Sequence, residues 1–81
     1  KNRLGDEGLE VLLNSEKIRN IKNLDLRNNQ ITRQGMILLS ETKNLSNLEY
    51  LDLRVNKLGK KWEEKLKQKG KLPKLSQLRI A

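Results

Sequence analysis

Leucines alternate with polar residues in short stretches of this chain. Leu24 and Leu26 flank Asp25, and the same four residues, Leu-Asp-Leu-Arg, return at 51–54. Successive side chains of a strand point to opposite faces, so this pattern predicts strands with leucines on one face and polar residues on the other. The predicted strands span residues 22–27, 49–54 and 76–80.

The stretches repeat with a period of 27 residues. Residues 21–31 and 48–58 match in register, and one further period reaches Leu75, Leu78 and Ile80. A fixed period of this length marks a solenoid, in which each unit buries its apolar face by stacking on its neighbours. Since identical units follow one another with a full crossover between them, we expect parallel strands.

The segments between the strands have helical spacing. Thr32 is a plausible N-cap, and Met36 and Leu39 follow it at helix-like intervals; Asp6 is the equivalent cap of an earlier helix. A period of 27 superposes Leu39 on apolar residues of the other two segments. The predicted helices lie near residues 6–14, 33–42 and 60–69.

Two asparagines, Asn29 and Asn56, come directly after the first two strands. An asparagine side chain donates to and accepts from backbone groups that neither a strand nor a helix satisfies. We therefore predict a structural role for both residues, as steps of an asparagine ladder.

The repeated sequence motif resembles the leucine-rich repeat, L-x-x-L-x-L-x-x-N-x-L. The repeat length and the sequence of Asn2–Leu9 resemble its ribonuclease-inhibitor-like subfamily. This resemblance implies an α/β solenoid with parallel strands on the concave side of a horseshoe and helices on the convex side. It implies one domain, residues 1–81, of about three repeats. We expect the domain to belong to a longer array.

The amino-acid composition excludes several classes of chemistry. The formal charge is +8, with net +2 in residues 1–40 and net +6 in residues 41–81, and the chain has neither Cys nor His. Thiol chemistry is thereby excluded, as are the commonest general base and metal ligand. Because Asp25 and Asp52 are expected on an open wall beside arginines, as a solvated pattern of opposite charges, we predict no enzyme, metal site or cofactor. No membrane-spanning run or signal peptide is present, which favours an intracellular location.

The polar strand face is the predicted site. We expect it to bind another protein, because a rigid row of strands displays side-chain columns at regular intervals and loses little entropy on binding. We expect stacked Arg27 and Arg54 to repel each other and so to favour an acidic or mixed-charge partner. For Tyr50 two interpretations stand equally: a binding anchor, or a ring lying over Asn23 and Gln77. The predicted binding residues are Asn23, Asp25, Arg27, Tyr50, Asp52, Arg54, Gln77 and Arg79.

Three alternatives remain open. The lysine-rich stretch Lys57–Lys74 is either a solvated face held by Trp62 and Leu66, or a surface for nucleic acid or an anionic membrane. In another interpretation, the chain is a purely structural segment of a larger array, and the ligand binds repeats outside this chain. Self-association is a further expectation for a short stack of this kind.

Overall fold

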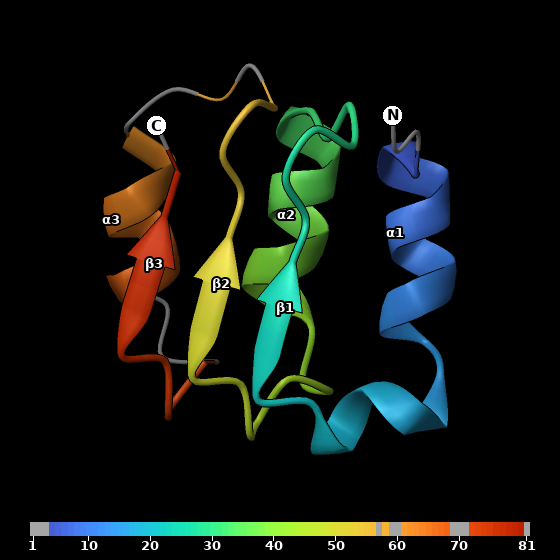
Figure 1. Cartoon of the computed structure of the whole chain (residues 1–81), viewed down its shortest axis with the longest axis vertical. Coiled ribbons are helices and arrows are strands. Elements are labelled where there is room, and N and C mark those ends of the chain that lie inside the picture. The colour runs from blue at the N-terminus through green and yellow to red at the C-terminus, as the bar shows by residue number, and fades with distance from the viewer. Residues whose placement is uncertain (1–3, 57, 59–60, 69–71, 81) are drawn as a thin grey trace.

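The computed structural model describes residues 4–56, 58, 61–68 and 72–80. Three strands pair in the order β1-β2-β3, all parallel, in an open sheet. The sheet forms one layer, and helices α2 and α3 lie behind it, with α1 beyond β1 (Figure 1). The elements are α1 (Gly5–Leu13), the 3₁₀ helix η1 (Glu16–Asn20), β1 (Asn23–Asp25), α2 (Arg33–Glu41), β2 (Tyr50–Asp52), α3 (Lys61–Gln68) and β3 (Gln77–Arg79).

The predicted parallel strands and their register are confirmed. Leu24 pairs with Leu51, and Leu51 with Leu78, so equivalent positions of the 27-residue period lie side by side. The regular strands are three residues long, shorter than predicted, although Leu26 N–H still donates to the carbonyl of Asp52 at 2.8 Å. The first strand cannot continue through Asn28, whose φ of 56° turns the chain.

The leucine face of the sheet packs on the helices. Leu51 and Leu53 of the central strand region are fully buried, as are Met36 and Leu39 of α2. Trp62, which replaces a glycine of the earlier repeats, is also buried, and Lys65 Nζ lies 4.7 Å from the centre of its ring. The core consists of Leu9, Leu13, Ile18, Leu24, Leu26, Ile31, Met36, Leu39, Leu45, Leu48, Leu51, Leu53, Trp62, Leu66, Leu72 and Ile80.

The helix predictions hold to within one residue at each end that the structure describes, with two differences. The segment Glu16–Asn20 forms a 3₁₀ helix that the sequence pattern does not indicate. It contains a single buried apolar residue, Ile18, which defines no helical spacing. The expectation that Asp6 caps its own helix is wrong. Its carboxylate accepts from the backbone N–H of Thr32 at 2.9 Å and from the Thr32 hydroxyl, and so joins α1 to the start of α2.

This junction depends on Gly35. A Cβ atom there would lie 2.6 Å from Ile31 Cγ2 and would collide with the Asp6 carboxylate. We expect Gly35→Ala to lower the free energy of unfolding by about 2 kcal/mol, since overpacking outweighs the roughly 1 kcal/mol that alanine adds to helix propensity. Chemical denaturation measures the change.

Gly8→Ala is the matched control in α1. The three atoms nearest to a Cβ at Gly8 all belong to the side chain of Leu4, with Cδ1 at 2.7 Å. Because this side chain can rotate away, we expect a smaller loss than at Gly35. Equal losses for the two variants would contradict the packing described for the Asp6–Thr32 junction.

Candidate functional site

The face of the sheet opposite the helices carries the polar residues of the strands, and we call it the outer face. Asn23 pairs with Tyr50 and Tyr50 with Gln77; Asp25 pairs with Asp52 and Asp52 with Arg79. Arg27 and Arg54 follow the strands and bond to the aspartates of this face. The structure thus brings all eight sequence-predicted binding residues onto one face.

Arg27 and Asp25 form an ion pair within one repeat. Arg27 Nη2 lies 2.8 Å from Asp25 Oδ2, and Arg27 Nε lies 3.0 Å from Asp25 Oδ1, which also accepts the Arg27 backbone N–H. Both side chains are about half exposed. The Arg27 side chain lowers the pKa of Asp25, and the aspartate in turn raises the pKa of Arg27.

Asp52 is the equivalent aspartate of the next repeat, and it is buried. Its side chain is only 2% exposed, whereas that of Asp25 is 55% exposed. The Arg54 guanidinium donates to it through Nε at 2.9 Å and Nη2 at 2.6 Å, and the Tyr50 hydroxyl donates at 3.0 Å. The expectation that Asp52 faces solvent is therefore wrong, because β1, β3 and these two side chains enclose it.

The expected repulsion between Arg27 and Arg54 is present, since Arg54 acts to lower the pKa of Arg27, but the aspartates outweigh it and the pKa of Arg27 is raised overall. Each arginine pairs with the aspartate two residues before it, and Arg27 Nε additionally lies 3.7 Å from Asp52 Oδ2. Side chains two residues apart share a strand face, so the repeated Asp-Leu-Arg wording was the sequence signal for these pairs. The four charges compensate one another on the outer face.

Tyr50 has a structural role that the sequence did not indicate. It is half-buried, and its hydroxyl donates to Asp52. The two interpretations of its ring, as a binding anchor or as a cover over Asn23 and Gln77, both stay predictions.

Arg79 stands apart from this compensated group. It occupies the aspartate position of the third repeat, is exposed, and pairs along the sheet with Asp52. Among the residues that the structure describes, no carboxylate forms an ion pair with Arg79. Asn23 and Gln77 are exposed as well. Arg79 therefore gives the outer face its excess positive charge.

The burial of Asp52 predicts a pH dependence of stability. Hydrogen bonds from Arg54 lower the pKa of Asp52 from 3.8 to about 2. A carboxyl group with a lowered folded-state pKa stabilises the fold above its unfolded pKa, and this contribution disappears as the pH falls toward the folded value. We expect Asp52 to contribute about 2 kcal/mol that is lost between pH 5 and pH 2.

Urea denaturation across this pH range measures the loss in the wild type and in Asp52→Asn. The variant lacks the titrating group, so the difference in unfolding free energy between the two proteins should shrink as the pH falls. A difference that stays constant from pH 5 to pH 2 would contradict the assignment.

Comparison with protein families matches one segment of this chain. Residues 17–40 match a family model described as Leucine Rich repeat, across η1, β1, the Asn29 turn and most of α2. This match supports a leucine-rich repeat protein. The ribonuclease-inhibitor-like subfamily stays a prediction. The comparisons with curated proteins and with solved structures gave no match.

Two features of these repeats could not be predicted from the sequence. Val55 follows Arg54, is 70% exposed and has a φ of 62°, a backbone conformation that β-branched residues disfavour. Two hollows also border Val55, and each is lined by residues up to about 30 positions apart in the chain, namely 28–56 for one and 25–55 for the other. Hollows of this kind depend on how the repeats stack, which a local pattern does not reveal.

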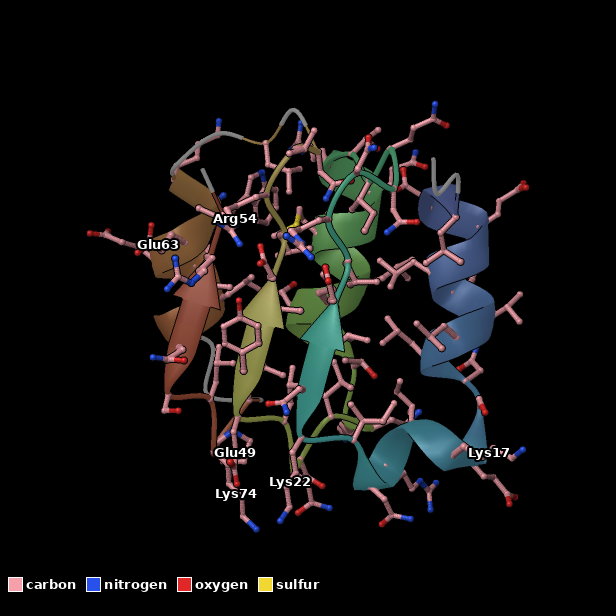
Figure 2. All side chains as sticks on the ribbon, viewed as in Figure 1. Lys17, Lys22, Glu49, Arg54, Glu63 and Lys74 are labelled. Atoms are coloured by element: carbon pink, nitrogen blue, oxygen red, sulfur yellow. The ribbon has the colours of Figure 1, made fainter. Side chains whose placement is uncertain are left out.

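The described, exposed lysines of the lysine-rich stretch lie on α3 and shortly before β3. Lys61 and Lys65 of α3 are exposed, and Lys74 donates to Asn47 Oδ1 at 3.2 Å. Figure 2 shows Lys74, Lys22 and Glu49 together where the strands begin, whereas Arg54 lies beyond the end of β2. Lys57, Lys60, Lys69 and Lys71 lie outside the described residues.

No helix of the described chain combines the length and apolar character needed to cross a membrane. Nor do the described residues gather three or more carboxylate, imidazole or thiol groups in an arrangement that would hold a metal ion.

Proposed function

We propose that this leucine-rich repeat chain is a protein-interaction module that binds its partner through the outer face. The supporting observation is a row of side chains on three paired strands, already ordered by the ion pairs of Asp25 and Asp52. A surface that is ordered before binding loses little conformational entropy in the complex. We further propose that the repeats form a section of a solenoid with the strands on its concave side.

The charge of the outer face supports a partner with an acidic or mixed-charge surface. Arg79 has no ion pair among the described residues, and each aspartate-bound guanidinium keeps N–H groups that can still donate. A carboxylate that meets Arg79 forms a charge-assisted hydrogen bond without displacing an existing pair. Asn23, Tyr50 and Gln77 add polar and aromatic contacts beside it.

The pull-down that tests this proposal uses variants outside the ion pairs. Removing Arg54 would also deprive the buried Asp52 of its partner, so a loss of binding would then be ambiguous. Gln77→Ala/Arg79→Ala removes two exposed side chains of β3 instead. Arg19→Ala/Asn20→Ala on η1 is the matched control, since it also removes one guanidinium and one carboxamide that are exposed.

We expect the wild type and the control to capture a protein that the Gln77→Ala/Arg79→Ala variant loses, with and without nuclease. Material that nuclease removes, and that the variant retains, would contradict the proposal and favour nucleic acid on the lysine-rich stretch. Capture of no protein by the wild type would also contradict it.

A further inference from the structure

Val55 presents an apolar side chain to solvent at a position that suits valine poorly. The equivalent residue of the preceding repeat is Asn28, which adopts nearly the same backbone conformation, with a φ of 56° against 62° for Val55. Asparagine tolerates this left-handed region, whereas a β-branched residue is strained there. With 70% of its surface exposed, Val55 contributes little to the core. Neither the backbone nor the packing therefore accounts for a valine at this position.

Two hollows meet at Val55. The larger, about 480 Å³, is lined by Ile31 and Val55 together with polar side chains of the two turns that follow β1 and β2. The smaller, about 300 Å³, is lined by Asp25, Arg27, Asn28 and Val55. A partner's side chain placed against Val55 would occupy part of the larger hollow and lose contact with water on that side. The described residues that line the larger hollow are uncharged, and the charged residues of the smaller one, Asp25 and Arg27, compensate each other, so this site favours an uncharged group.

Arg79 is the outer-face cation for which the described residues provide no ion pair. It pairs with Asp52, and Val55 follows Asp52 by three residues. Three residues of nearly extended chain and one strand spacing place the two positions roughly 10 Å apart. This distance equals about one turn of a polyproline II helix, in which residues three apart lie on the same side.

We infer that the partner of this chain is a peptide segment in the polyproline II conformation, which carries a carboxylate and, three residues away on the same side, an aliphatic side chain. The carboxylate binds Arg79, and the aliphatic side chain packs on Val55 over the larger hollow. The positive charge of Arg79 and the neutral, partly apolar hollow together select this occupant. The inference rests on the proposed function, because it assumes that the outer face is the binding surface.

A selection from a displayed library of random linear peptides tests the inference. The bait is the 81-residue chain, in the wild type and in four variants. Val55→Asn removes the apolar side chain, and Val11→Asn is its matched control, a valine of α1 that is 73% exposed. Arg79→Gln removes the cation, and Arg19→Gln on η1 is its control.

We expect the wild type to enrich peptides that pair Asp or Glu with Val, Leu or Ile three residues away. A synthetic peptide of that sequence should bind Val55→Asn and Arg79→Gln about tenfold more weakly than the wild type. It should bind the two control variants with unchanged affinity. Because asparagine suits the backbone at position 55, the melting temperature of Val55→Asn should equal or exceed that of the wild type.

The outcomes separate this inference from the proposed function. Peptides that need Arg79 but bind Val55→Asn as tightly as the wild type overturn the inference and leave the outer face as the binding surface. Enriched peptides without the carboxylate and aliphatic pair also overturn it. Enrichment of no peptide overturns the inference alone, since the pull-down tests the proposed function separately. Peptides that bind Arg79→Gln and Val55→Asn unchanged, together with a pull-down in which Gln77→Ala/Arg79→Ala retains the protein, overturn both.

Discussion

Asn56→Ala is expected to lower the free energy of unfolding by about 3–5 kcal/mol, since it removes several buried hydrogen bonds at once. The Asn56 carboxamide oxygen accepts the backbone N–H groups of Asn29 at 2.9 Å and Ile31 at 3.0 Å. Its nitrogen donates to the carbonyls of Leu26 at 2.7 Å and Leu53 at 2.9 Å. The residue thus joins two consecutive repeats, and alanine would leave these backbone groups without their partner.

Asn29→Ala provides the internal comparison. The Asn29 side chain makes two described bonds, one with the Leu4 N–H at 3.2 Å and one with the Arg27 carbonyl at 2.9 Å. We expect a loss of about 1–3 kcal/mol for Asn29→Ala, smaller than that for Asn56→Ala. Urea denaturation of both variants measures the order. An unchanged stability of Asn56→Ala, or a larger loss at Asn29, would contradict the asparagine ladder.

Arg54→Ala is expected to lower the free energy of unfolding by about 3 kcal/mol, since it strips a buried carboxylate of its ion pair. Arg54 makes two guanidinium bonds to Asp52, and Asp52 is 2% exposed. Water that enters in place of the arginine side chain recovers part of the lost solvation, which keeps the loss at the lower end for broken buried pairs.

Arg27→Ala is the matched control for Arg54→Ala. Arg27 occupies the same position of the preceding repeat, but its partner Asp25 is 55% exposed. Exposed ion pairs contribute up to about 1 kcal/mol, so we expect a loss no larger than this for Arg27→Ala. Thermal and chemical denaturation compare the two variants. Equal losses would mean that Asp52 is as well solvated as Asp25.

Most of the fold could be predicted from the 27-residue period. It predicted parallel strands whose pairing puts Leu24, Leu51 and Leu78 side by side. It also predicted the described ends of the three α-helices to within one residue. These features follow from local patterns, because alternation defines a strand face and a repeat defines its neighbour. Turn asparagines were equally readable, since their side chains bond to nearby backbone groups.

The differences between repeats were not predictable from local wording. Asp25 and Asp52 share the sequence Asp-Leu-Arg, yet Asp52 is buried and Asp25 is exposed. Asp52 lies on the central strand, between two neighbouring strands, and has a tyrosine two residues before it, where Asp25 has Asn23. Burial here depends on what stacks on either side of a residue. The bond from Asp6 to Thr32 joins residues 26 positions apart and escapes a local reading of helix caps for the same reason.

The most direct test of outer-face binding is nuclear magnetic resonance of the ¹⁵N-labelled chain, titrated with the protein that the wild type captures. The side-chain amides of Asn23 and Gln77 report on the outer face, and the indole N–H of Trp62 reports on α3. Binding through the outer face predicts that both amide resonances shift or broaden while the Trp62 resonance keeps its position. A shift of the Trp62 resonance with unchanged Asn23 and Gln77 amides would contradict it.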